Sequence, residues 1–486
     1  MVSNAPLQSF SRRRLLRTFS IRSPHPYRPF ASVFLLICFY LEISSPFPAS
    51  GRSKPSRKIS VLILTGQNNH DWKATTPVLK RILESSGRFI VTVTDHPEKC
   101  TAQSLKPYDV ILSNWNTYGG GPVKTWPAAA RDGIINFVRS GKGFVVVHAG
   151  SSSFYDWKEY QQMVAATWRN GVTWHAPKHL FYVHITDPSQ PITHGMRIFV
   201  TDDELWNNTV VQPGVQSLAS GYSDKSTGGS GNDEPILFVR SFGKGRTCAL
   251  MLGHDAAAMS DLGFQTLLRR GTEWAATGRV TIPVPNMALT PKQLDFVLKG
   301  VASYVAGDRR DPLWMLQYDV GQVAGTSQAE LTARKLAQLV NDPHATAAGR
   351  QFACGQLALI GTARQAPILA GLLNDKTVAF QARAALEIIP GPAALSAMRK
   401  ALLSSSGEKR LGLISALAAR RDILSIPVFK KLALTSDPKL VSAAVTALGD
   451  MGDPASLSAL KGLAGKLPKA LRRTYLEALL HDAVGL

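Results

Sequence analysis

The sequence predicts two structural parts: an α/β domain with a parallel sheet over residues 58–280, and an all-α array of helical repeats over residues 329–486. The first part alternates short apolar runs with segments of helical spacing, which is typical of a parallel sheet covered by helices on both faces. In the second part, leucines recur at intervals of 30 and 31 residues, which indicates a helical solenoid. Residues 281–328 are predicted to form a linker and a helical connection between the parts.

Each element of the first part follows from its local pattern. Apolar or alternating runs predict strands at residues 59–65, 89–93, 109–113, 143–147 and 246–252. Apolar positions three and four apart predict helices at residues 76–85, 128–139 and 262–276. Residues 180–250 are richer in Gly, Pro and Asp, and we expect them to add antiparallel strands. Pro283 and Pro285 mark the linker, across which we expect few contacts.

Two series of leucines predict the repeats of the second part. One series has a period of 31 residues and the other a period of 30: Leu386, Leu417, Leu448 and Leu372, Leu402, Leu432. Pro392, Pro427 and Pro454 follow the first helix of their units, where proline favours the start of a second helix. The alternative is that these helices simply cover one side of the first part, in which case no fixed repeat length is expected.

The composition indicates a globular chain without a nucleic-acid partner. The 486 residues are 45% hydrophobic and 18% charged, with 55 basic against 34 acidic residues. Most of the positive excess lies before residue 59 and after residue 327, where the basic residues of the repeats are not interleaved with aromatic ones. The four cysteines lack metal-ligand spacing, so we expect mostly buried thiols.

Residues 1–51 have the pattern of an export signal. Basic residues in SRRRLLR are followed by the apolar run FASVFLLICFYLEI and by small residues at Ala49, Ser50 and Gly51. The apolar run has 14 residues, fewer than a bilayer-spanning helix needs, so a membrane anchor is the weaker alternative. SRRRLLR also resembles a twin-arginine signal, which leaves the export route open.

Polar residues follow the strands of the predicted sheet, where ligands bind in this class of fold. The strand at residues 143–147 leads directly into His148, and the strand at residues 246–252 leads into His254. Trp174, His175 and the segment DDELW lie between them in the sequence. We therefore expect a convergent polar and aromatic cluster at the strand ends.

Several motifs carry a family resemblance over residues 59–278. They are GQNNHDW, GKGFVVVHAG, TWHAPKH, DPSQPITHGM, DDELW, GKGRTCALMLGHD and TEWAATG, in that order. They resemble the motifs of the ThuA-like (trehalose utilization) family, which implies the flavodoxin-like fold of the class I glutamine amidotransferases. The later segment FQARAALEIIPGPAALSAMRKALLS resembles HEAT-type repeats.

The resemblance also implies which chemistry is excluded. His148 stands where the amidotransferases have their nucleophilic cysteine, and His254 where they have their catalytic histidine. Attack on a glutamine amide needs a thiolate, so amidotransferase activity by this route is excluded. Whether the chain is an enzyme stays open, with a sugar isomerase, lyase or hydrolase as candidates.

The candidate site residues divide by role. We expect His148, His254 and Glu204 to be catalytic, because a histidine can both accept and donate a proton near neutral pH. A divalent metal is a second option, with His148, His175, Glu204 and His254 as candidate ligands. The candidate substrate-binding residues are His70, Trp72, Asn114, Ser151, Trp157, His175 and Asp255. The tryptophans could stack on sugar rings or simply pack under loops.

We therefore predict an exported protein, periplasmic or extracellular, that acts on a disaccharide, glycoside or keto-sugar. The substrate class follows from the family resemblance alone. The alternative is a non-catalytic module that binds a sugar or another ligand, with the HEAT-like array docking a protein partner.

We predict that the mature protein begins near Arg52, because the apolar run is too short to span a membrane and ends before small residues. N-terminal sequencing of the exported protein should read from this point. An intact Met1 in a membrane fraction would show that the leader is an anchor.

Overall fold

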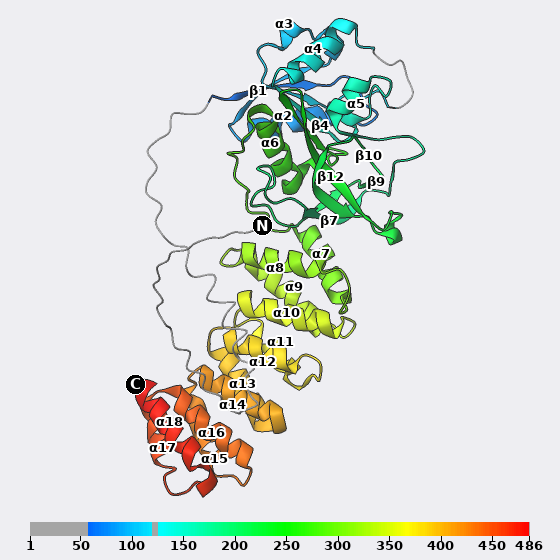
Figure 1. Ribbon diagram of the computed structural model, residues 1–486. Coiled ribbons are helices and arrows are strands. Elements are labelled where there is room, and N and C mark those ends of the chain that lie inside the picture. Colours follow the sequence, from blue (N-terminus) through cyan, green and yellow to red (C-terminus); the bar gives the residue numbers. More distant parts are fainter. Residues whose placement is uncertain (1–56, 119–124, 486) are drawn as a thin grey trace, which may run out of the picture. The chain divides into compact units, whose positions relative to one another are not determined.

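The computed structural model describes residues 57–118 and 125–485 (Figure 1). Its first part is built on a nine-stranded sheet with the order β2-β1-β3-β4-β13-β12-β11-β7-β8. The predicted leader, residues 1–51, lies outside the described residues. No helix in the described ranges is long and apolar enough to cross a bilayer.

Half of this sheet is parallel, as predicted. Its strands are β2 (Phe89–Thr94), β1 (Ile59–Leu64), β3 (Val110–Ser113), β4 (Gly143–Val147) and β13 (Gly245–Leu250). Their spatial order corresponds to 2-1-3-4-5 along the chain, which is the flavodoxin-like order. Every residue of β3 and β4 is buried, so both faces of the sheet are covered there.

The other half of the sheet is antiparallel, which confirms the expectation for residues 180–250. It contains β12 (Asp233–Phe242), β11 (Gln216–Tyr222), β7 (His179–Ile185) and β8 (Phe199–Asp203). Two small sheets add the pairs β5 (Ala166–Thr167) with β10 (Val210–Val211), and β6 (Trp174–His175) with β9 (Trp206–Asn207).

Two groups of helices cover the parallel half (Figure 1). In one group, α2 (Trp72–Glu84) packs against α6 (Leu262–Thr277), which lies on β3, β4 and β13. In the other, α4 (Ala128–Arg139) packs against α3 (Ala102–Leu105) and α5 (Lys158–Val164), and α5 lies on β4 and β13. Helix α6 begins where the Asp261 carboxylate accepts a hydrogen bond from the Gly263 N–H, and it ends at the left-handed Gly278.

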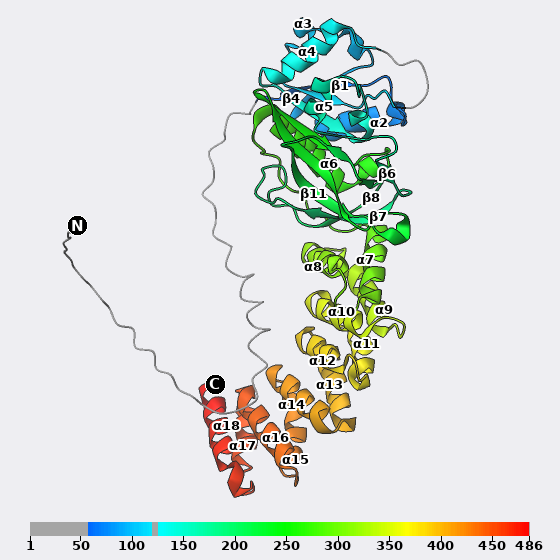
Figure 2. The same ribbon diagram turned by 45° about the vertical axis from the view of Figure 1, so that its right-hand side comes forward.

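The C-terminal part is a stack of helix pairs, as the leucine register predicted (Figures 1 and 2). Every second helix of this part contacts the next helix of the same series, so each repeat packs on the next. Leu386, Leu417 and Leu448 are fully buried between them. The helices are α9 (Ala329–Asn341), α10 (Ala347–Ile360), α11 (Ala366–Gly371), α12 (Ala379–Ile388), α13 (Pro392–Ser404), α14 (Gly407–Ala419), α15 (Ile426–Leu432), α16 (Pro438–Met451), α17 (Pro454–Lys461) and α18 (Arg472–Gly485).

Short 3₁₀ helices complete the described chain. They are η1 (Pro97–Lys99), η2 (His148–Ser151), η3 (Lys225–Thr227), η4 (Ala258–Ser260), η5 (Leu372–Asn374), η6 (Ile423–Ser425) and η7 (Lys469–Leu471). Cys100, Cys248 and Cys354 are buried free thiols, and burial raises the pKa of each.

The expectation of few contacts across the linker is wrong. Helices α7 (Pro291–Ser303) and α8 (Asp311–Val323) follow the linker prolines, and Val200 of β8 shares an apolar cluster with Leu294 and Val297 of α7. The side chain of Gln293 also donates a hydrogen bond to the Val200 carbonyl, at 2.9 Å. Strand β8 is an edge strand whose backbone needs a partner on its free side, and α7 provides one.

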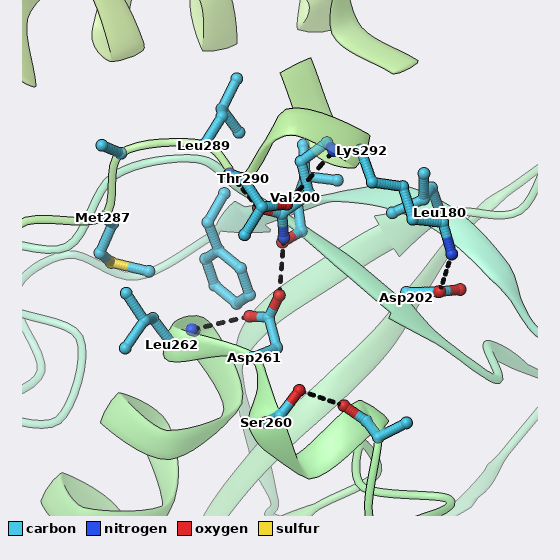
Figure 3. Close-up of a pocket in the computed structure, with 15 residues that line it drawn as sticks. Leu180, Val200, Asp202, Ser260, Asp261, Leu262, Met287, Leu289, Thr290 and Lys292 are labelled. Atoms are coloured by element: carbon cyan, nitrogen blue, oxygen red, sulfur yellow. Dashed lines mark hydrogen bonds and ion pairs between the residues drawn. The ribbon is translucent and has the colours of Figure 1, made fainter. Parts of the chain in front are cut away.

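A groove of about 290 Å³ lies between β8, the start of α6 and the start of α7 (Figure 3). Asp261 lies in this groove, and its carboxylate accepts hydrogen bonds from the Gly263 N–H and from the Gln293 amide, both at 2.8 Å. Burial raises the pKa of Asp261 to about 6, which outweighs the lowering effect of these hydrogen bonds.

We predict that Asp261→Asn removes part of the pH dependence of stability. The folded pKa of about 6 exceeds the usual value of about 3.9, so the folded protein binds more protons between these pH values. The free energy of unfolding should therefore fall as pH rises through this window and then level off. Between pH 4 and 7, the free energy of unfolding of the Asn variant, measured in urea, should rise by on the order of 2 kcal/mol relative to that of the parent chain. Parallel profiles for the two proteins would contradict this expectation.

Candidate active site

Two neighbouring parallel strands bring His148 and His254 together. Strand β4 pairs with β13, with Val147 opposite Leu250, so the segments after both strands leave the sheet at the same edge. The centroids of the two imidazole rings lie 5.4 Å apart. The structure thus brings together the two histidines that the sequence placed at strand ends.

The turn after β4 fixes the His148 ring. His148 has a φ of 45°, a left-handed conformation that is unusual for a residue other than glycine. Its Nδ1 lies 2.6 Å from the Met251 carbonyl oxygen. A carbonyl only accepts hydrogen bonds, so Nδ1 carries the proton, and Nε2 of the neutral ring is left with a lone pair. Gly150 follows in the same turn, and a Cβ there would lie 2.4 Å from the Ser113 carbonyl oxygen.

Asp203 ties the end of β8 to the segment after β13. Its fully buried carboxylate accepts hydrogen bonds from the backbone N–H groups of Gly253 at 2.6 Å, Glu204 at 2.9 Å and His254 at 3.1 Å. These bonds set the position of Glu204 relative to His254. Burial raises the pKa of Asp203, against the lowering effect of His148 and of the three N–H groups.

The Glu204 carboxylate is the centre of the site. Its Oε2 lies 3.0 Å from His254 Nδ1 and 3.4 Å from His148 Nε2, and its Oε1 lies 3.5 Å from His175 Nδ1. Burial disfavours its charge, but the contacts with His148 and His254 outweigh burial and lower the pKa of Glu204. The contact with Glu204 raises the pKa of His254. The carboxylate therefore favours the ionised state and His254 favours the protonated state.

His70 completes the cluster from the loop between β1 and α2. Its ring centroid lies 4.6 Å from that of His254 and 5.0 Å from that of His148. The Asn68 side-chain oxygen accepts hydrogen bonds from the His70 backbone N–H at 2.9 Å and from Nδ1 at 3.2 Å. Burial, helped by His148 and His254, lowers the pKa of His70 to about 3, so its ring is neutral at pH 7.

These four residues could hold a metal ion. One ligand atom from each of His70, His148, Glu204 and His254 lies within 4.8 Å of the others. The sequence had predicted His175 in place of His70. The structure puts His175 beside the outer oxygen of Glu204, with its Nδ1 2.9 Å from the Ala176 carbonyl oxygen.

A small cavity of about 100 Å³ opens beside the cluster. Trp206 lies against His148, with 4.7 Å between ring centroids, and Trp168 lies 5.2 Å from Trp206. The lining residues are Asn69, His70, Tyr118, Ala149, Ser152, Trp168, His175, Glu204 and Trp206. The sequence patterns did not indicate Asn69, Tyr118, Ser152 or Trp168 as site residues, although Trp168 lies shortly before the motif TWHAPKH.

Five predicted substrate-binding residues do not line this cavity. Trp157 is buried and stacked on Tyr160, and Ser151 is fully buried with its hydroxyl donating to the His148 carbonyl. Asn114 is buried and donates to the hydroxyls of Thr75 and Thr76. Trp72 lies at the start of α2, and Asp255 pairs with Lys178 at 2.8 Å and caps the turn at Ala258. Residues near strand ends also hold loops in place, as the hydrogen bonds of Asn114, Ser151 and Asp255 show.

We predict that Asp203→Asn destabilises the protein by about 2 to 3 kcal/mol. An amide has one accepting oxygen in place of two, and its NH₂ group cannot accept hydrogen bonds from the backbone N–H groups. Urea unfolding measures the loss. The matched control is Asp202→Asn, the adjacent residue, whose carboxylate pairs with the exposed Lys292. A surface pair of this kind contributes less than about 1 kcal/mol. Equal losses for the two variants would contradict the role given to Asp203.

Comparisons with known proteins match both parts of the chain to families. A family model described as trehalose utilisation matches residues 60–275, and a model of HEAT repeats matches residues 395–480. The comparison with curated proteins found no match.

Solved structures include three similar chains. A ThuA-like protein from Parabacteroides merdae is 31% identical, with 47% of this chain and 94% of that chain covered and a TM-score of 0.43. One from Bacteroides uniformis is 20% identical over 48% and 98% of the two chains, with a TM-score of 0.37. A cytoplasmic protein from Salmonella typhimurium is 14% identical over 44% and 98%, with a TM-score of 0.34. The family model and the 31% identity together show that the chain belongs to the ThuA-like family, with HEAT repeats in its C-terminal part.

Proposed function

We propose that the ThuA-like domain is an enzyme that transfers a proton on a sugar or keto-sugar, with Glu204, His148 and His254 as its catalytic residues. One observation carries this proposal: a single buried carboxylate contacts the rings of both strand-end histidines beside a cavity lined by aromatic side chains. Proton transfer needs such groups within reach of one reacting atom.

The electrostatics of the cluster support acid and base roles. Glu204 and His254 shift each other's pKa in opposite directions, so at neutral pH one is an ionised acceptor and the other favours carrying a proton. Pairs of titratable groups with pKa values pushed apart are typical of acid and base catalysts. The His254 side chain is 27% exposed and the buried Glu204 lines the cavity, so a ligand can reach both.

The sugar part of the proposal rests on the aromatic lining and on the family. Flat rings such as Trp168 and Trp206 present apolar faces on which a sugar ring can stack. The matching family model is described by trehalose utilisation. A volume of about 100 Å³ corresponds to about three water molecules. We therefore expect the cavity to take the reacting edge of one sugar ring, with the rest of a glycoside at the mouth.

We further propose that the protein acts outside the cytoplasm, because its first 51 residues have the pattern of an export signal. The HEAT repeats suggest interaction with a protein, since stacked repeats form extended binding surfaces. A non-catalytic sugar-binding module with the same docking array is the alternative function.

Hydrogen–deuterium exchange on carbon tests the proposed reaction. The mature chain is incubated in D₂O with a panel of glycosides and keto-glycosides, and the products are read by NMR and mass spectrometry. We expect deuterium to enter at a carbon next to the carbonyl of a keto-glycoside. Glu204→Gln and His254→Ala should lower the rate by at least about 100-fold, as expected when a general acid or base is removed.

The control variant for this assay is His481→Ala, which removes an exposed histidine of the HEAT repeats. Its exchange rate should equal that of the parent chain. Binding of a keto-glycoside without exchange or turnover by the parent chain would support the non-catalytic alternative and overturn the proposed reaction.

A further inference from the structure

We infer that His70, His148, His254 and Glu204 form a binding site for a divalent transition-metal ion of the Zn²⁺ type. We call these four residues the histidine–glutamate cluster. The inference rests on the proposed function in that it concerns the same cluster and names the cofactor that the reaction would use. Its support, however, comes from the positions of the ligand atoms and not from the identity of a substrate.

The spacing of the ligand atoms fits such an ion. Zn²⁺ binds imidazole nitrogen and carboxylate oxygen at about 2.0–2.1 Å, so the ligand atoms of a tetrahedral site lie about 3.3 Å apart. In the histidine–glutamate cluster, Glu204 Oε2 lies 3.4 Å from His148 Nε2 and 3.0 Å from His254 Nδ1. All four ligand atoms lie within 4.8 Å of one another. The two distances from the Glu204 oxygen are therefore close to the edge length of a tetrahedral site.

Two of the rings are held by a hydrogen bond from the nitrogen that points away from the cluster, as is common for metal-ligating histidines. His148 Nδ1 donates to the Met251 carbonyl, and His70 Nδ1 donates to the Asn68 side-chain oxygen. A hydrogen bond of this kind fixes the tautomer and leaves the Nε2 lone pair for the ion. Asn68 is itself held by the Asn116 amide at 2.9 Å. The Nε2 lone pairs of His148 and His70 are thus available to bind an ion in the cluster.

Two of the nitrogens lack any other partner. His148 is 3% exposed, and its Nε2 and the Nδ1 of His254 are buried without a hydrogen bond. Both atoms lie close to Glu204, yet neither is aligned for a hydrogen bond with it. Closeness without alignment leaves a common point between the atoms at which a cation can bind, and such an ion would displace the proton that His254 carries beside Glu204. A buried polar atom without a partner is unfavourable, and a cation at this point would satisfy all of them at once.

The donor set selects the class of ion. Three imidazole nitrogens and one carboxylate oxygen suit Zn²⁺ and neighbouring first-row ions, whereas Ca²⁺ and Mg²⁺ prefer sites made of oxygen atoms. The thiols of Cys100, Cys248 and Cys354 take no part in the cluster, so a thiolate site for a softer ion is not built here.

One side of the cluster is open. His70 and Glu204 also line the cavity of about 100 Å³, so a small molecule there would reach the ion directly. An open position is characteristic of catalytic metal sites rather than structural ones. His175 also lies on this open side, beside the outer oxygen of Glu204, and is not among the four ligands.

Metal analysis of the full mature chain tests the inference. The chain is purified without a histidine tag, its metal content is measured by mass spectrometry, and Zn²⁺ affinity is measured by competition with a chelating dye. We expect about one equivalent of a transition ion per chain. His70→Ala and His254→Ala should lose it, and Co²⁺ added to the parent chain should give the visible spectrum of a low-coordinate site with nitrogen ligands.

The matched control is His175→Ala, which removes an imidazole 3.5 Å from Glu204 Oε1 but outside the ligand set. It should retain the ion. Asn68→Ala, which removes only the support of His70, should weaken Zn²⁺ binding by about 10- to 100-fold. Circular dichroism establishes whether each variant is folded, and His70 lies half-buried in a loop outside the sheet.

The outcomes separate the two proposals. A folded parent chain that binds no transition ion, or binds it as well after His70→Ala and His254→Ala as before, overturns the metal site. Carbon exchange that persists in such a metal-free chain leaves the proposed function standing. A chain that binds one ion through these residues but shows no reaction on the sugar panel supports the site and contradicts the sugar chemistry.

Discussion

The arrangement of the site depends on one buried carboxylate. Strand β8 is the last strand of the sheet and lies four positions from β13, yet Asp203 at its end bonds to the backbone of Gly253 and His254. The antiparallel half must therefore curl back over the ends of the parallel strands. This curl brings Glu204 over His148, and the carboxylate of Asp203 holds it there. Adjacent residues of one strand end thus have different tasks, because Asp203 fixes the backbone and Glu204 faces the rings.

Much of the fold follows from the sequence because the local patterns agree with the tertiary contacts. The predicted strand at residues 143–147 and helix at residues 128–139 coincide with β4 and α4. Strand ends of a parallel sheet share one edge, so the pairing of His148 with His254 follows from topology alone. Helices α7 and α8 were predicted only as part of a connection. Their packing on β8 depends on which strand lies at the edge of the sheet, and the edge strand cannot be identified from a local sequence pattern.

The rest of the site could not be read from the sequence for a related reason. His70 reaches the cluster because Asn68 and Asn116 fix the loop after β1, and these bonds join residues 48 positions apart. Trp168 lies in a segment without regular periodicity, where a pattern gives no orientation. The substitution of His70 for His175 among the predicted metal ligands shows the limit clearly. His175 contacts Glu204, but the set of ligand atoms within 4.8 Å of one another includes His70 and not His175, and sequence spacing does not report such distances.

The left-handed backbone of His148 has a consequence for recognition. A φ of 45° is strained for a residue with a side chain, and glycine would adopt it more easily. In the folded protein, a hydrogen bond to the Met251 carbonyl and packing against Trp206 hold the His148 ring in one orientation. The orientational entropy of the imidazole is therefore lost once, when the protein folds, rather than at every binding event. A ligand that reaches this ring meets a rigid partner, so shape selection at that point should be strict, while adaptability is left to the more exposed His175 and His254.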